Sequence, residues 1–198
     1  MKTNREYRNV FELRAKDNEN FIVEGYATTF NKPYTLYRIG DYEVKEQISP
    51  NAFDECDLSD VIMQYDHKGR VFARNRNKTL ELSTDSQGLF IRANLGSTEG
   101  SKSLFEDIKT GLIDRMSIGF IVGEDEKVYT TNHDTGVETC LRTIKKISKL
   151  YDVSAVSIPA NDTTSISARN FSDGVIAEME AERLLRAKLK LKLKLQGD

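Results

Sequence analysis

Several residue types are scarce in this chain, and each shortage excludes a class of protein. The sequence has only two cysteines, Cys56 and Cys140, without CxxC spacing, and only two histidines. A zinc site needs three or four ligands, so we expect no metal centre and two reduced thiols of an intracellular protein. No apolar run reaches the roughly eighteen residues of a membrane span, and residues 1–7 carry charges where a signal peptide is apolar.

An excess of positive charge is also missing. The chain has 29 lysines and arginines against 31 aspartates and glutamates, a formal net charge of −2. Nucleic-acid-binding domains are usually basic, so this balance argues against a nucleic-acid partner. The 198 residues, 38% of them hydrophobic, suffice for one domain with an ordinary core, or for one domain and a tail. We expect a soluble globular protein with no membrane partner.

Short apolar segments separated by turn residues predict a chain rich in β-strands. Residues 8–30 alternate in period two around a polar turn, which is the pattern of a hairpin. Further segments predict strands at 61–66, 70–74, 78–83 and 88–95, a hairpin tip at 134–136, and paired strands over 143–158. We therefore predict an α+β fold that is mainly β, with an antiparallel β-barrel-like core surrounded by a few helices.

Helical patterns are fewer. Residues 98–109 place apolar side chains at helical spacing, and Gly111 lies where a C-terminal cap belongs. Ser49 followed by Pro50 predicts the start of a short helix. We divide the chain into a domain at 1–170 and a tail at 171–198, which is helical first and then alternates lysine and leucine, a pattern that fits a helix poorly.

Three segments carry residues suited to nucleophilic catalysis. His67 closes the apolar run 61–67, Ser117 lies inside 115–120, and Asp152 opens 152–161. A serine hydroxyl needs a base to take its proton, and a histidine base needs a third group to orient its ring. Strand alternation would put Ser117 on the face opposite its apolar neighbours. The order His, Ser, Asp is acceptable because triads are recognised by geometry rather than by chain order.

Each of these residues also has a structural interpretation. Ser117 could be an ordinary strand serine, His67 could form a surface ion pair with Asp66, and Asp152 could be a turn residue. His133 lies in a polar segment and is best interpreted as a solvated loop residue. Spacing alone therefore leaves a serine hydrolase as one hypothesis. A small-molecule esterase is disfavoured because Ser117 has no Gly-x-Ser-x-Gly elbow.

Five segments in order resemble the prohead protease family of tailed phages with a capsid of the HK97 type. The resemblance covers about residues 8–165. Its motifs are Val-Glu-Gly-Tyr-Ala at 23–27 followed by Phe30, the run 46–53, Asp66-His67, the strand 115–120, and 152–161. Any one of these motifs is weak, whereas five in the family's order are specific.

The resemblance implies a fold and an activity. The related herpesvirus maturation proteases are largely antiparallel β-barrels surrounded by helices, and their triad is His, Ser, His. Here it implies a serine endopeptidase with His67, Ser117 and Asp152 as the triad and with no cofactor. Family members have Glu-Val-Ser at the third position, where this chain has Asp152 with a shorter side chain. The paired arginines near the oxyanion site of the herpesvirus enzymes are absent from 157–161, so this route assigns no oxyanion donors.

The resemblance also implies partners. Such a protease acts inside the immature procapsid in the host cytoplasm, cleaves the scaffolding segment of the major capsid protein, and degrades itself. The herpesvirus enzymes depend on dimers, so self-association is expected by analogy. The tail at 171–198 would suit a cleaved segment, an attachment to the scaffold, or a solvated helix. A non-catalytic scaffold or capsid-binding protein with the same fold is the alternative.

Overall fold

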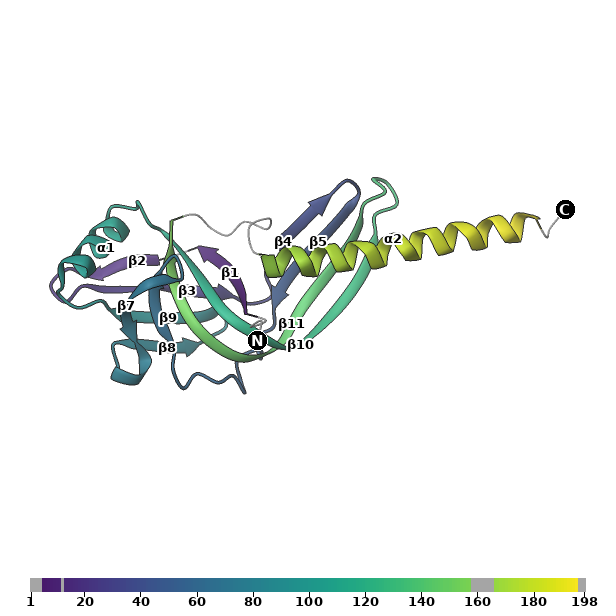
Figure 1. Cartoon of the computed structure of the whole chain (residues 1–198). Coiled ribbons are helices and arrows are strands. Elements are labelled where there is room, and N and C mark those ends of the chain that lie inside the picture. Colours follow the sequence, from purple (N-terminus) through teal and green to yellow (C-terminus); the bar gives the residue numbers. More distant parts are fainter. Residues whose placement is uncertain (1–4, 12, 158–165, 196–198) are drawn as a thin grey trace.

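A computed structural model of the chain describes residues 5–11, 13–157 and 166–195 and consists mainly of β-strands (Figure 1). The strands are β1 (Glu6–Phe11), β2 (Leu13–Asp17), β3 (Ile22–Thr29), β4 (Tyr34–Ile39), β5 (Tyr42–Ile48), β6 (Ile62–Tyr65), β7 (Lys68–Arg74), β8 (Leu80–Thr84), β9 (Gly88–Asn94), β10 (Arg115–Thr131) and β11 (Glu138–Val156). The helices are α1 (Glu99–Lys109), α2 (Ile166–Leu195) and the short 3-10 helix η1 (Asn75–Asn77).

The larger sheet has seven strands and is organised around the long strand β11. Its main order is β1-β10-β11-β5-β4. Strand β6 also pairs with β11, and β7 pairs with β6. The first half of β11 pairs in parallel with β5 through residues 138–144, and its second half pairs in parallel with β6 through 152–155. Strand β10 lies antiparallel along the other side of β11. Three segments, β6, β10 and β11, therefore meet at residues 152–155.

The smaller sheet contains the predicted N-terminal hairpin. Its strand order is β2-β3-β9-β8, and β2 and β3 form the hairpin expected within residues 8–30. Strand β1 lies outside this sheet because it pairs antiparallel with β10. The predicted strands over 61–95 are confirmed as β6 to β9. The two sheets enclose one main cluster of fully buried side chains, including Phe105, Phe120 and Met63.

Helix α1 follows the predicted rules closely. The Thr98 hydroxyl accepts a hydrogen bond from the Ser101 backbone N–H at the start of the helix. The buried positions Ser101, Leu104, Phe105 and Ile108 form one face at helical spacing. Gly111, with a φ of +76°, follows the end of the helix in the left-handed conformation that glycine adopts easily.

The strands β10 and β11 form a long hairpin whose end lies beside β4 and β5, with its turn around residues 132–137 as predicted (Figure 1). A second buried cluster lies between this part of the molecule and α2. It combines the sheet residues Leu36, Val44 and Cys140 with the helix residues Val175, Ile176 and Met179. Residues 171–179 of α2 therefore pack on the sheet, and the boundary at residue 170 stays a prediction.

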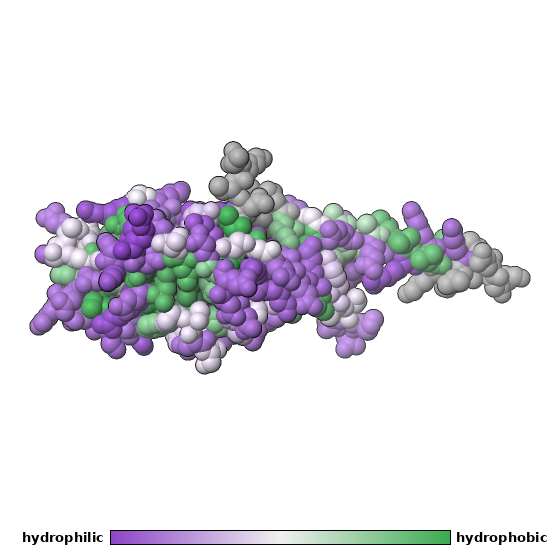
Figure 2. Space-filling view, turned by 90° about the horizontal axis from the view of Figure 1, so that it is seen from below, coloured by the Kyte–Doolittle hydropathy of each residue, from purple (hydrophilic) through white to green (hydrophobic). Residues whose placement is uncertain are grey.

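The outer part of α2 projects away from the sheets as an arm (Figures 1 and 2). We expected its lysine–leucine alternation to fit a helix poorly, but the helix continues to Leu195. Lysine and leucine are both strong helix formers, so intrinsic propensity outweighs the period-two pattern there. The leucines consequently spread around the cylinder, and Leu184, Leu185, Leu189 and Leu191 are all more than half exposed.

Three other expectations need correction. No helix follows Ser49, because residues 50–55 form consecutive turns. Backbone hydrogen bonds to β11 hold this segment: the Ser49 N–H donates to the Ile144 carbonyl, and the Ala52 carbonyl accepts from the Ile147 N–H. Residues 143–156 belong to one strand rather than two paired strands. The mainly β class with few helices is confirmed, yet the described strands form two open sheets and not a closed barrel.

Within the described ranges, no helix is long and apolar enough to cross a membrane.

Candidate active site

Ser117 lies on β10 where this strand is paired along both edges, with β1 on one side and β11 on the other. It stands directly opposite Ser154 on β11 and opposite Asn9 on β1. Its neighbours Met116 and Ile118 are fully buried core residues, and Ser117 itself has no exposed surface. The apolar neighbours hold the strand in place, and alternation directs the serine side chain to the opposite face.

His67 lies in the two-residue turn between β6 and β7. The strands pair through Tyr65 and Lys68, which leaves Asp66 and His67 as the turn residues. Both have positive φ angles, 49° and 57°, as a type I′ turn requires. Aspartate and histidine tolerate this left-handed conformation better than most residues other than glycine and asparagine. The tight turn therefore presents the imidazole at the end of β6.

Asp66 fixes this turn to the end of β11. Its backbone N–H donates to the Ala155 carbonyl at 2.9 Å. Its carboxylate accepts hydrogen bonds from the Ser157 backbone N–H at 2.9 Å and from the Ser157 hydroxyl at 2.8 Å. These contacts engage Asp66 with the end of β11, and His67 contacts a different acid, Asp152.

Asp152 lies on β11, opposite Gly119 on β10 and beside Ile62 on β6. Its carboxylate has no exposed surface. Its Oδ1 atom accepts a hydrogen bond from the Ser154 hydroxyl at 2.7 Å and lies 2.5 Å from His67 Nδ1. Its Oδ2 atom contacts the guanidinium of Arg5. A buried carboxylate requires such donors, since each compensates part of its lost hydration.

The three predicted residues therefore form one chain of hydrogen bonds. His67 Nε2 lies 2.6 Å from Ser117 Oγ, and His67 Nδ1 lies 2.5 Å from Asp152 Oδ1. When Nδ1 carries the proton donated to Asp152, Nε2 is the free acceptor for the serine proton. Such an arrangement can activate a hydroxyl as a nucleophile and stabilise the resulting imidazolium. The catalytic roles themselves stay a prediction.

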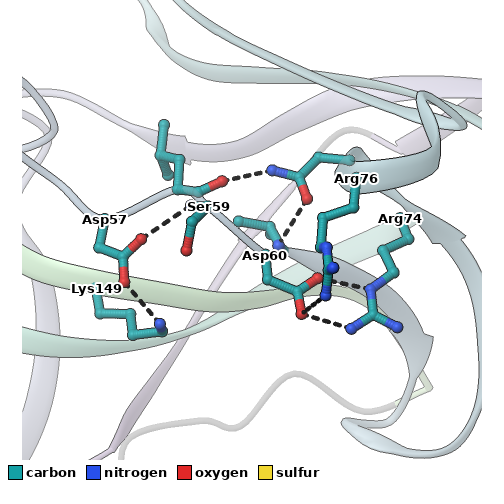
Figure 3. A network of polar contacts seen from close by, with 9 residues as sticks. Asp57, Ser59, Asp60, Arg74, Arg76 and Lys149 are labelled. Atoms are coloured by element: carbon teal, nitrogen blue, oxygen red, sulfur yellow. Dashed lines mark hydrogen bonds and ion pairs between the residues drawn. The ribbon is translucent and has the colours of Figure 1, made fainter.

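A network of polar contacts anchors the segment that leads into β6 (Figure 3). Asp57 accepts hydrogen bonds from Lys149 of β11 at 2.6 Å and from the Ser59 backbone N–H at 2.9 Å. Lys149 holds the pKa of the Asp57 carboxyl well below its usual range, with a further contribution from Ser59. These contacts tie the chain before β6 to the strand that carries Asp152.

The same network ties this segment to the end of β7. Arg74 donates to both carboxylate oxygens of Asp60, at 2.6 and 2.5 Å (Figure 3). Asn75 accepts from the Val61 backbone N–H at 2.9 Å and donates to the Leu58 carbonyl at 2.5 Å. Both ends of the β6–β7 hairpin are thereby held, so the position of His67 at its turn is set by the sheet.

Sequence reasoning missed Gly119, which the site requires to be small. A β-carbon at this position would lie 2.4 Å from Asp152 Oδ2 and 2.8 Å from Arg5 Nε. The glycine follows Ser117 by two residues in the sequence, but the need for a glycine there arises from its pairing with Asp152 on the neighbouring strand. Ser154, two residues after Asp152 on the same strand, lies on the same face and donates its hydroxyl to Asp152.

The remaining candidate residues lie outside the site. His133 is exposed in the turn between β10 and β11. Cys56 and Cys140 are free thiols, and burial raises the pKa of both, that of Cys56 to about 11. In the part of the chain that the structure describes, no three His, Cys, Asp or Glu side chains gather as metal ligands. Residues 158–161 of the last motif lie outside the described ranges.

Comparisons with known proteins agree with the serine-protease chemistry. The family model described as caudovirus prohead serine protease matches residues 9–179. The prohead protease of Enterobacteria phage HK97 is 30% identical over 174 residues, which covers 86% of this chain and 69% of the relative. No solved structure gives a significant match. The matched region contains Ser117, His67 and Asp152.

Proposed function

Because the chain belongs to the caudovirus prohead serine protease family and is a capsid maturation protease, we propose that Ser117, His67 and Asp152 are its catalytic residues. The observation that carries this proposal is the continuous contact from Ser117 Oγ to His67 Nε2 at 2.6 Å and from His67 Nδ1 to Asp152 Oδ1 at 2.5 Å. The three residues come from separate strands or turns: His67 lies 50 positions from Ser117 and 85 positions from Asp152 in the sequence.

The proposed reaction is peptide hydrolysis through an acyl-enzyme. Ser117 Oγ attacks the scissile carbonyl carbon while His67 Nε2 takes its proton. Asp152 stabilises the imidazolium, which then gives its proton to the departing amine. Water attacks the acyl-enzyme, His67 again accepts a proton, and Ser117 is released. No step requires a metal ion or an organic cofactor.

We propose the scaffolding segment of the major capsid protein as the substrate, together with the protease itself. This choice is supported by the family and by its HK97 relative, which is named a prohead protease. The site of action would be the procapsid in the host cytoplasm. Self-association and a fold related to the herpesvirus maturation proteases belong to the same proposal. The net charge of −2 supports a protein partner over a nucleic acid.

The deciding experiment compares the intact masses of wild type, Ser117→Ala and Ser83→Ala, each incubated with the matching capsid protein. Ser83 is an exposed serine on β8 of the other sheet and serves as the matched control. We expect fragments of the capsid protein with wild type and with Ser83→Ala, and none with Ser117→Ala. Cleavage by Ser117→Ala at the wild-type rate would refute the assignment of the nucleophile.

The alternative function is a non-catalytic scaffold or capsid-binding protein of the same fold. It predicts that the wild type binds the capsid protein but leaves it intact, and that a serine-directed phosphonate does not label Ser117. Fragment formation that depends on Ser117 excludes this alternative. Masses of the protease fragments from the same samples would also show whether the chain cleaves itself.

A further inference from the structure

The contact that Asp152 Oδ2 makes with Arg5 joins the site to the beginning of the chain. Arg5 immediately precedes β1, which pairs with β10 from Glu6 opposite Phe120 to Phe11 opposite Arg115. This pairing brings Arg5 to the buried carboxylate across 147 positions of sequence. Asp152 thus has two kinds of partner, with His67 and Ser154 on Oδ1 and a guanidinium on Oδ2.

The side chain of Arg5 is held in place by two aromatic rings. Its guanidinium lies 4.5 Å from the centre of the Tyr151 ring and 5.3 Å from that of Tyr7. The Tyr7 ring in turn lies 4.3 Å from the His67 imidazole, centre to centre. Arg5 is about one quarter exposed, and Gly119 leaves the space in which its Nε and Nη2 atoms approach Asp152. Packing from two strands therefore fixes the guanidinium at Oδ2.

The charge of Arg5 matters because Asp152 is fully buried. A carboxylate without exposed surface is costly to keep ionised unless a cation or several donors compensate it. Several titratable groups lie around Asp152 and His67. Arg5, just before β1, contacts Asp152, and Tyr7 of β1 packs on the imidazole. Tyr151 of β11 packs on Arg5, and Asp66 precedes His67 in the turn. Asp66 is bonded to Ser157, and the guanidinium of Arg5 is the cationic group that forms a salt bridge with the Asp152 carboxylate.

We propose that Arg5 is a positioning residue of the catalytic centre, which keeps Asp152 ionised and turns its Oδ1 atom toward His67. This inference rests on the proposed roles of Ser117, His67 and Asp152. It makes the beginning of the chain part of the active site, because Arg5 immediately precedes β1 and the Tyr7 ring of β1 packs on the imidazole. Arg5 contacts the Asp152 carboxylate, so its effect reaches the reaction through Asp152 and His67.

The expected consequence is a change in kcat and in its pH dependence. Without the positive charge, Asp152 is harder to keep ionised and the imidazolium is easier to form. Both effects make the enzyme lose its free base at a higher pH, so the acidic limb of the kcat profile moves upward. The loss of one charge-assisted hydrogen bond corresponds to about a tenfold to hundredfold fall in kcat. KM should stay near its wild-type value, because Arg5 reaches the substrate only through other groups.

The test measures kcat and KM for cleavage of the capsid protein as a function of pH in Arg5→Gln, Arg5→Lys and Arg14→Gln. Glutamine keeps a hydrogen-bond donor but removes the charge, whereas lysine keeps the charge but loses the planar fork. Arg14 pairs with Glu24 in the other sheet and is the matched control. We expect Arg5→Gln to lower kcat and raise the acidic limb, Arg5→Lys to restore the limb, and Arg14→Gln to behave as wild type.

A wild-type kcat together with an unchanged acidic limb in Arg5→Gln would overturn the inference. If Arg5→Gln does not fold, as judged by thermal unfolding, Arg5→Lys decides, because lysine keeps the charge but loses the planar fork. A lowered kcat with the acidic limb at the wild-type pH supports the inference, and a wild-type kcat or a limb displaced upward overturns it. Ser117→Ala separates this result from the proposed function. An inactive Ser117→Ala with a fully active Arg5→Gln refutes only the role of Arg5, whereas an active Ser117→Ala refutes the proposed function itself.

Discussion

Gly119 lies directly opposite Asp152 in the β10–β11 pair, and a methyl group on Gly119 would come within 2.4 Å of the Asp152 carboxylate. The closest atom is Oδ2, on the side of the carboxylate that faces Arg5. Because Gly119 has no side chain, the buried acid Asp152 fits on the neighbouring strand. Gly119 itself lies two residues after the candidate nucleophile Ser117, on the same face of β10.

We expect Gly119→Ala to displace Asp152 and to lower kcat by at least about tenfold, since a small misplacement of an orienting group is costly. Overpacking at this buried position should also lower the free energy of unfolding by about 1–3 kcal/mol. Peptidase assays and thermal unfolding would measure the two effects. The control is Gly123→Ala on the same strand, where a β-carbon would meet the Ser148 hydroxyl of an exposed residue. Equal activity of both variants would contradict the explanation.

Asp152→Asn should lower kcat by at least about a hundredfold with little change in KM, because an amide neither stabilises the imidazolium nor selects the Nδ1–H tautomer. Ser154→Ala, which removes one donor to Asp152, should cost about tenfold or less. Steady-state kinetics on the capsid protein would give both values. An unchanged kcat in Asp152→Asn would leave a Ser117–His67 dyad.

Substitutions of Asp66 should separate the shape of the turn from its anchoring. Asp66→Asn keeps a residue that tolerates positive φ and can still accept hydrogen bonds from Ser157, so we expect it to retain most activity. Asp66→Gly keeps the turn but loses the anchor to Ser157, and its kcat should fall further. Activity assays with thermal unfolding would establish this order. The same activity in both variants would show that the anchor does not position His67.

The pairing of Asp57 with Lys149 should be visible in acid. The pKa of the Asp57 carboxyl is lowered in the folded protein by Lys149, so the stabilisation from this pair is present above the ordinary pKa of an aspartate and is lost as pH falls through the lowered value. In Lys149→Met, the Asp57 carbon resonance should titrate at a higher pH than in wild type. The difference in Tm between the two proteins should shrink below about pH 4. A constant difference would mean that Lys149 acts by packing alone.

Alkylation should distinguish the serine from the thiols. Burial raises the pKa of Cys56 to about 11, so little of the reactive thiolate is present near neutral pH. We expect iodoacetamide at neutral pH to modify Cys56 slowly and to leave cleavage of the capsid protein intact, whereas a phosphonate should label Ser117. Mass spectrometry of the labelled peptides would identify the sites. Rapid loss of activity with iodoacetamide would point to a thiol in the reaction.

Local pattern was sufficient for much of the fold. The α1 helix, the N-terminal hairpin and the strands between residues 61 and 95 follow from periodicity, capping and turn residues, which act over a few neighbouring positions. The prediction failed where distant pairing competed with local preference. Pro50 after Ser49 favours a helix, but the backbone around it bonds to Ile144 and Ile147 of β11 and forms turns instead.

The sequence by itself determined which residues are candidates for the chemistry, because His67, Ser117 and Asp152 each lie in a short segment with its own recognisable motif. It could not bring them together or find their supporting residues. Alternation assigns a side chain to a face of a strand but not to a partner strand or a register. Only the tertiary structure decided that Gly119 opposes Asp152 and that Arg5 reaches the same carboxylate. Hydrogen bonds and ion pairs require contact over about 3 Å, here between segments as far as 147 positions apart in the chain.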